Sequence, residues 1–103
     1  MKVRDIAAAR SGDKGSTLDL TLVAFDDAGY EALAARVTAA VVEAWLSPTV
    51  RGPVTRHLLP GLRAVKYVAP EALAGGVFAS LHAGVHWQKA AIWLLLDRDL
   101  PET

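Results

Sequence analysis

An alternating run in the first quarter of the chain limits the fold more than any other feature. Between Thr17 and Phe25, apolar residues occupy every second position: Leu18, Leu20, Leu22 and Ala24. A period of two is typical of a β-strand that buries one face and leaves the other toward solvent. The run therefore predicts a sheet that packs one of its faces on a hydrophobic core.

A long amphipathic helix is predicted directly after this strand. The pair Asp26-Asp27 marks its start, with Asp27 as the better N-cap, and Pro48 stops it, so the predicted helix runs from Asp27 to about Leu46. Apolar residues spaced three and four apart form one face of it: Tyr30, Leu33, Val37, Val41 and Trp45. This stripe is expected to cover the sheet.

A second helix is predicted over about His86–Leu96. Its apolar residues surround nearly the whole helix axis, which indicates burial on more than one side. The second buried side is either the interior of the domain or a subunit interface, and the sequence leaves both open.

Three further segments complete the predicted sheet. Val3–Ala9 and Val54–Leu59 are predicted strands, while Leu62–Val68 is either a strand or a short helical segment limited by Pro70. We therefore expect an α+β fold: a two-layer sandwich with a mixed or antiparallel sheet of about four strands and two main helices. At 103 residues, the chain is expected to form a single domain over residues 1–103.

Composition excludes several classes of function. Eleven basic and eleven acidic residues give a formal net charge of zero, which argues against general binding to nucleic acid or anionic membranes. There is no cysteine, so disulfides, thiolate catalysis and cysteine metal sites are excluded. No apolar run is long enough to span a membrane and no secretory signal is seen, so a cytoplasmic location is expected. An apolar content of 52% favours a homo-oligomer, a dimer or larger, or a partner subunit.

The polar stretch Ala9–Ser16 is the main candidate for a functional site. It lies between two predicted strands, so we expect it to form a long hairpin loop. Gly12 and Gly15 permit positive φ, and consecutive backbone N–H groups in such a turn can form a nest that binds an anion. The stretch is not a Walker A loop, because Lys14 precedes Gly15 and a strand follows in place of a helix.

The side chains of this stretch suit an anion too. Arg10 can hold a carboxylate or phosphate by two parallel hydrogen bonds, Lys14 adds a point charge, and Ser11 adds a hydroxyl. Asp13 can cap the turn, pair with a neighbouring cation or act as a base. The alternative is an ordinary polar turn in which Arg10 and Lys14 are simply solvated.

The histidines and tryptophans carry weaker indications. His82 and His86 are four residues apart, but no third ligand is spaced near them, so no metal site is predicted. Trp45, Trp87 and Trp93 are interpreted as core or interface anchors.

Several segments resemble one family along nearly the whole chain. The motif Ala9-Arg10-Ser11-Gly12-Asp13-Lys14-Gly15 resembles the defining motif of the AtuA-like domain, the small C-terminal region of acyclic terpene utilisation AtuA proteins. Similar matches are the strand Arg51–Val54 with Arg56 and Leu59-Pro60, the segment Leu62–Val68, and the stretch from Leu73 to Leu81. The resemblance implies a ferredoxin-like α+β sandwich and a context in acyl-CoA or terpenoid catabolism.

The sequence departs from the family pattern at polar positions. Asp19 and Lys66 each stand where the family has an asparagine. Gly84 stands in place of a later aspartate, and the Gly-Lys pair of the family falls near Trp87-Gln88. The first motif is thus kept, while the polar residues later in the pattern are changed.

The resemblance and the polar stretch together give three functional hypotheses. In the first, the chain is an accessory or regulatory subunit that binds an anionic ligand, with a CoA thioester as the best candidate and no other cofactor. The binding residues would be Arg10, Ser11, Gly12, Asp13, Lys14 and Gly15, with Lys66 as an additional cation. In the second, Asp13 is a general base and Lys14 an electrostatic stabiliser for acyl-CoA hydration or lyase chemistry. In the third, the last helix and Trp93 dock a larger acyl-CoA-processing partner.

Overall fold

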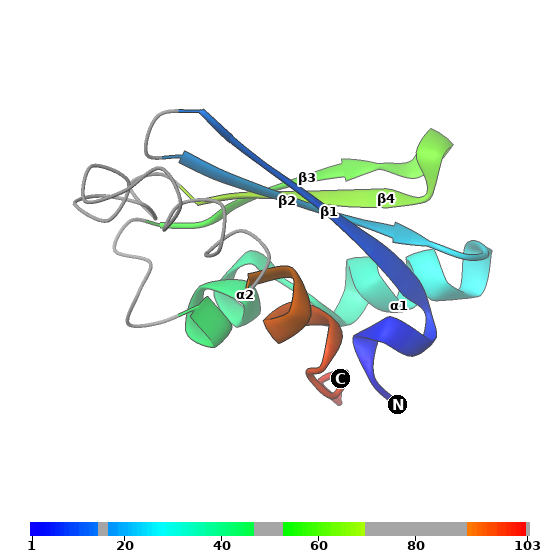
Figure 1. Cartoon of the computed structure of the whole chain (residues 1–103). Coiled ribbons are helices and arrows are strands. Elements are labelled where there is room, and N and C mark those ends of the chain that lie inside the picture. The colour runs from blue at the N-terminus through cyan, green and yellow to red at the C-terminus, as the bar shows by residue number, and fades with distance from the viewer. Residues whose placement is uncertain (15–16, 47–52, 70–90, 103) are drawn as a thin grey trace.

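The computed structural model describes residues 1–14, 17–46, 53–69 and 91–102, with residues 13 and 14 described by their backbone alone (Figure 1). Its elements in chain order are the 3-10 helix η1 (Val3–Asp5), β1 (Ala7–Lys14), β2 (Thr17–Ala24), α1 (Asp27–Arg36), α2 (Ala39–Leu46), β3 (Thr55–Leu59), the 3-10 helix η2 (Pro60–Leu62) and β4 (Ala64–Ala69). Residues 91–96 are also helical.

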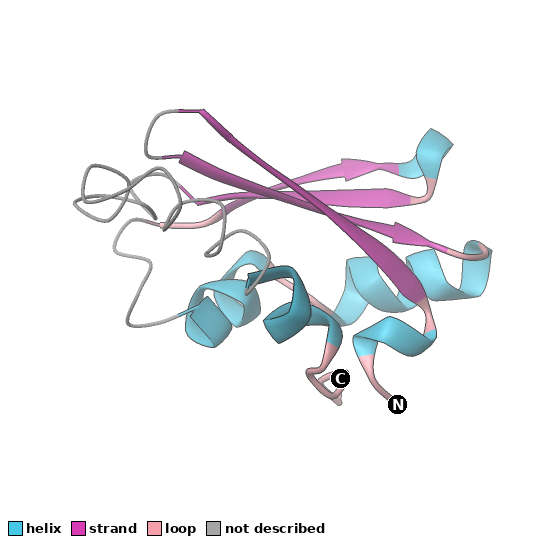
Figure 2. Cartoon of the chain, in the orientation of Figure 1, coloured by secondary structure: helices cyan, strands magenta, loops and turns pink. Residues whose placement is uncertain are grey.

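The strands form one sheet in the order β1-β2-β4-β3, and every neighbouring pair is antiparallel. Two hairpins, β1-β2 and β3-β4, therefore lie side by side with β2 and β4 in the centre. The helices α1 and α2 and the helical residues 91–96 lie on the same side of the sheet, whereas η2 lies at the end of the β3-β4 hairpin (Figure 2). The predicted α+β class and the antiparallel, two-layer arrangement are confirmed.

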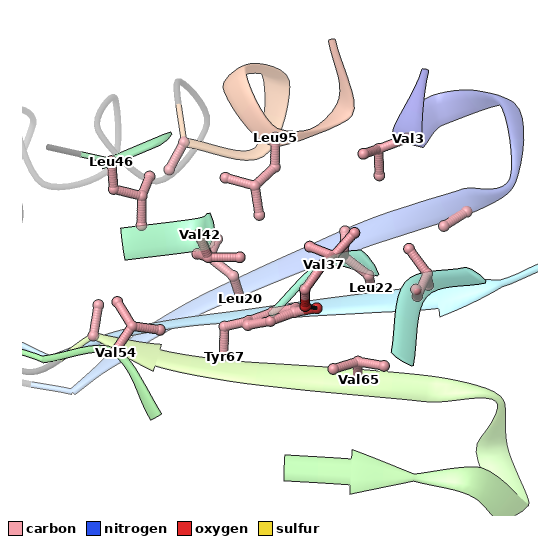
Figure 3. Packing of buried hydrophobic residues seen from close by; sticks show 14 of the residues in the cluster. Val3, Leu20, Leu22, Val37, Val42, Leu46, Val54, Val65, Tyr67 and Leu95 are labelled. Atoms are coloured by element: carbon pink, nitrogen blue, oxygen red, sulfur yellow. Dashed lines mark hydrogen bonds between the residues drawn. The ribbon is translucent and has the colours of Figure 1, made fainter. Parts of the chain in front are cut away.

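The core lies between the sheet and this helical layer. Leu18, Leu20, Leu22 and Ala24 are all buried and alternate with half-buried residues, as the sequence pattern predicts. In the register of the sheet, Leu22 lies opposite Val65 and Leu20 lies opposite Tyr67, so β4 supplies the neighbouring core side chains (Figure 3). Burying each large side chain of this kind stabilises the fold by roughly 1.5–3 kcal/mol.

The segment that the sequence left open is a strand. β4 begins at Ala64, after the 3-10 helix η2 has reversed the chain from β3. Arg63 closes that turn in the left-handed region with φ 52°. The turn places His57 and Lys66 opposite one another on adjacent strands.

The single helix predicted from Asp27 to Leu46 is wrong, because the chain breaks into α1 and α2 at Val37 and Thr38. Thr38 accepts a hydrogen bond at its hydroxyl oxygen from the Val41 backbone N–H (3.2 Å), which is the interaction of an N-cap at the start of α2. The break shifts the helical phase. Leu33 and Val37 are buried as expected, but beyond the break Val42 and Leu46 are buried in place of the predicted Val41 and Trp45.

The start of α1 also differs from the prediction by one residue. Asp26 is the N-cap, and its carboxylate accepts a hydrogen bond from the Gly29 backbone N–H at 2.7 Å. Asp27 lies in the first turn instead, where its carboxylate forms an ion pair with Arg63. An extended backbone at Asp26 lets its side chain reach back over the first turn, which Asp27 in helical conformation cannot do.

Two sheet residues hold the end of α1 at the break. The Arg56 guanidinium donates to the carbonyl oxygens of Ala34 (2.8 Å) and Val37 (3.2 Å), and the Tyr67 hydroxyl donates to Val37 O at 2.6 Å. The last carbonyls of a helix lack partners within the helix, so these bonds satisfy them. Burial raises the pKa of the Tyr67 hydroxyl well above its ordinary value.

The predicted first strand, Val3–Ala9, is wrong at its beginning. Val3–Asp5 is the 3-10 helix η1, in which the Asp5 carboxylate accepts a hydrogen bond from the Lys2 backbone N–H at 2.7 Å. Such a local side-chain bond competes with strand pairing. The two chain ends also meet here, since the Val3 N–H donates to Arg98 O at 2.9 Å and the Leu100 N–H donates to Met1 O at 2.9 Å (Figure 1).

The last predicted helix is described only over residues 91–96. Its earlier part lies outside the described residues, as do Arg51 and Gly52 and the stretch from Leu73 to Leu81. Ala91 and Leu95 are fully buried, whereas Trp93 is 58% exposed. The described part of this helix thus packs one side on the core and presents another side outward. No helix in the described part of the chain is long and apolar enough to cross a membrane.

Candidate functional site

The polar motif is part of a strand, so the prediction of a long hairpin loop is wrong. β1 continues through Lys14, and each of its residues pairs with β2, with Arg10 opposite Thr21 and Gly12 opposite Asp19. Gly12 has no left-handed φ, and it therefore does not form the predicted nest. β1 is an edge strand, and such strands often carry polar and charged side chains. Its pairing with β2 satisfies the backbone N–H and C=O groups of β2 that face it.

The register divides the motif between the two faces of the sheet. Ser11 lies opposite the buried Leu20, on the side that the helices cover. Arg10 and Gly12 lie on the opposite side, which we call the open face. Asp13 and Lys14 take successive register positions, which belong to opposite faces. The side chains of these two residues, and Gly15 as a whole, lie outside the part of the chain that the structure describes.

One row of the open face crosses all four strands and carries three basic residues. We call it the basic row, and in sheet order it contains Arg10, Thr21, Lys66 and His57. Arg10 and His57 are exposed, while Thr21 and Lys66 are half-buried. Two strand spacings separate the Arg10 and Lys66 backbones by about 10 Å. Both long side chains can therefore reach one anion above the Thr21 hydroxyl between them.

Lys66 is held in this row by an ion pair. Its ammonium lies 3.0 Å from the Asp19 carboxylate, with side-chain exposures of 40% and 35%. Asp19 occupies the neighbouring row, so the pair is a diagonal contact between β2 and β4. The described charges of the open face are thus two cations and one carboxylate, in addition to His57. Asp19 and Lys66, the two positions at which the resemblance implies an asparagine, thus contact each other.

Sequence reasoning identified Arg10 and Lys66 but missed Thr21, Asp19 and His57. The alternation of β2 already places Thr21 and Asp19 on the face opposite the buried leucines. The alternation is visible in the sequence, but the pairing of β2 with both β1 and β4 is not. Without that register, neither residue can be assigned to a shared site.

The described residues were also considered as metal ligands. Among these residues, no group of three or more histidine, cysteine, aspartate or glutamate side chains could hold a metal ion. His82 and His86 lie outside the described residues.

Trp93 forms a second feature away from the sheet. The Arg4 guanidinium carbon lies 5.4 Å from the centroid of the Trp93 ring, and Arg4 also forms an ion pair with Asp97. A cation stacked on an indole in this way fixes the orientation of the ring. Of the other tryptophans, Trp45 is half-buried against the core, and Trp87 lies outside the described residues.

Comparison with known proteins gives one match. The model of the AtuA ferredoxin-like domain family matches residues 1–100. No curated protein and no solved structure matches the chain. The family match confirms the resemblance drawn from the sequence and the ferredoxin-like class of the fold.

Proposed function

Since the chain belongs to the AtuA ferredoxin-like domain family, we propose that it is an accessory or regulatory subunit associated with AtuA-type terpene utilisation. In this role it binds an anionic ligand on the open face of its sheet, and a CoA thioester is the best candidate. One observation carries the proposal: Arg10 and Lys66 flank Thr21 in the basic row.

The chemistry of these side chains fits a phosphate. The planar guanidinium of Arg10 can donate two parallel hydrogen bonds, and the ammonium of Lys66 supplies a compact charge. The Thr21 hydroxyl can donate a third bond between them. CoA carries several phosphate oxygens, so one phosphate group can engage all three. The Asp19 carboxylate lies in the next row and limits how far an anion extends in that direction.

A thermal-shift screen is the first test of the proposal. The purified protein is heated with CoA, short and branched acyl-CoAs, inorganic phosphate and divalent metal ions. A ligand that binds the native state raises Tm by mass action, so we expect a shift with the CoA species and none with the metals. A screen in which no anion raises Tm contradicts anion binding.

Calorimetric titration with CoA then tests the residues. We expect Arg10→Gln to weaken binding by between about tenfold and a hundredfold, because hydrogen bonds to charged groups contribute about 1.5–3 kcal/mol. Arg36→Gln is the matched control, since it removes the same charge from an exposed residue of α1, in the layer on the other side of the sheet. An equal loss of CoA affinity in both variants would mean that only the overall charge matters, and it would refute the assignment of Arg10.

A second candidate function, docking of a partner protein, is favoured by Trp93. An exposed tryptophan that is oriented by Arg4 resembles the aromatic anchors that dominate protein interfaces. The partner would be a larger acyl-CoA-processing subunit or a second copy of the chain. Light scattering over a concentration series tests the second copy: Trp93→Ser should lower the mass of an oligomer, and a monomer at every concentration argues against self-association.

A further inference from the structure

His57 is the member of the basic row that a single phosphate group above Thr21 does not use. It lies on β3, directly opposite Lys66, and its side chain is exposed to solvent. A second anion placed between Lys66 and His57 would lie one and a half strand spacings from Thr21, which is about 7 Å. The basic row is therefore long enough to hold two anionic groups side by side.

The charges of the open face direct a ligand along this row. The neighbouring row on one side contains the Asp19 carboxylate, which repels an anion displaced in that direction. The neighbouring row on the other side carries no charged side chain and contains Ala8, Val23, Ala64 and Leu59. An anion displaced in that direction moves away from the cations. Two anionic groups of one ligand are therefore best placed one after the other along the basic row.

We propose that the basic row binds a ligand with two separate phosphate groups. The first phosphate lies above Thr21, as in the proposed function on which this inference rests, and the second lies between Lys66 and His57. An imidazole donates one hydrogen bond when neutral and two when protonated, so His57 can donate to a phosphate oxygen in either form. The Lys66 ammonium has three donors, and when one points to Asp19 at 3.0 Å, two remain for the phosphates.

The spacing of the two positions selects how the phosphates are joined. The two phosphates of a diphosphate share one bridging oxygen and lie too close together to occupy both positions. In a nucleoside 3′,5′-bisphosphate, the ribose ring separates them. CoA has the same arrangement, because it carries a 3′-phosphate in addition to its 5′-diphosphate. The site would then recognise the nucleotide end of CoA, and the pantetheine arm and the acyl group would need no contact with the basic row.

Calorimetric titration with adenosine 3′,5′-bisphosphate, 5′-AMP and ADP tests the inference. 5′-AMP carries one phosphate group, and ADP carries two adjacent ones. We expect the bisphosphate to bind about tenfold tighter than either, or more, because its second phosphate adds hydrogen bonds to charged groups. For the same reason, CoA should bind about tenfold tighter than dephospho-CoA, which lacks the 3′-phosphate.

Variants of β3 then test the second position. His57→Ala should lower the affinity for the bisphosphate to about that for 5′-AMP and leave the affinity for 5′-AMP unchanged. His57→Arg restores a cation at this position and should keep the preference for the bisphosphate. Thr55→Ala is the matched control, because Thr55 is an exposed residue on the same strand and the same face, but lies in the row of Asp19.

The outcomes separate this inference from the proposed function. A preference for the bisphosphate that His57→Ala removes and Thr55→Ala keeps would support the inference. If 5′-AMP or ADP binds as tightly as the bisphosphate, the inference is overturned and the proposed function stands. The same holds if the preference survives in His57→Ala, or if Thr55→Ala removes it equally. If neither CoA nor any of the nucleotides binds, both the inference and the proposed function fail.

Discussion

The Tyr67 hydroxyl allows a sharp test of how the helical layer is attached to the sheet. Tyr67 is 1% exposed, and its hydroxyl donates to Val37 O at 2.6 Å (Figure 3). Tyr67→Phe keeps the buried ring and removes this bond. Because Arg56 still donates to the same carbonyl at 3.2 Å, the oxygen keeps one partner. We therefore expect a loss of about 1 kcal/mol in the free energy of unfolding, near the middle of the range for a neutral hydrogen bond.

The same substitution should change the response to alkaline pH. Burial raises the pKa of the Tyr67 hydroxyl, so above the ordinary tyrosine value of about 10 the unfolded chain releases a proton that the native protein keeps. The unfolded state then binds fewer protons than the native state, and the stability of the native protein falls as pH rises. Tyr67→Phe lacks this contribution. The stability advantage of the unmodified protein over the variant should thus shrink as pH rises above about 10.

Urea denaturation at about pH 8 and about pH 11 measures both effects. In a thermal melt at the lower pH, a loss of about 1 kcal/mol corresponds to a drop in Tm of about 4–8 °C for a domain of this size. Tyr30→Phe is the control, since Tyr30 is half-buried on α1 and takes no part in this contact. The reasoning is refuted if Tyr67→Phe matches the unmodified protein at the lower pH, or if the difference between them stays constant with pH.

Substitutions at three further places test other parts of the structure, by thermal or urea denaturation and, for Gly12, by CoA binding as well. Gly29→Ala should lower Tm despite the usual gain of about 1 kcal/mol for alanine in a helix, because a Cβ there meets a backbone carbonyl and the N-cap carboxylate, each at 3.1 Å. Gly61→Ala, with nothing within 4 Å, is the control and should be neutral. Gly12→Thr should preserve the fold and CoA binding, since Gly12 is uncrowded and lies in a strand; loss of either would contradict this strand placement of Gly12. Asp19→Asn and Lys66→Asn should each cost at most about 1 kcal/mol, and the double variant should recover part of the loss.

The sequence predicts those elements whose pattern is local. The alternation of β2 and the positions of the helices follow from apolar spacing within each segment. The break between α1 and α2 does not, because Val37 continues the apolar stripe of α1 without interruption. The partners that hold the break, Arg56 and Tyr67, lie 19 and 30 residues further along the chain from Val37. The apolar spacing within one segment carries no information about contacts between residues so far apart in the sequence.

The polar motif illustrates a different limit of sequence reasoning. Its glycines, hydroxyls and charges have the composition of a turn, and the structure nevertheless extends β1 through them to Lys14. Pairing with β2 decides this outcome, because the eight residues of β2 otherwise leave backbone groups without partners. The consequence for the site is large. Alternation along the strand keeps Arg10 on the open face and moves Ser11 to the side of the helices, so a motif that reads as one unit is divided.

The contact between Asp19 and Lys66 joins two differences that look independent in the sequence. Each stands where the resemblance implies an asparagine, and together they form an ion pair across β2 and β4. The net charge of the pair stays zero, but the charges are separated: the cation stands in the basic row beside Thr21, and the carboxylate stands one row away. A chain with asparagine at both positions would therefore keep a polar contact and lose the second cation. If Lys66 serves the ligand, the double variant should lose anion affinity while it keeps most of its stability, which distinguishes a binding residue from a purely structural one.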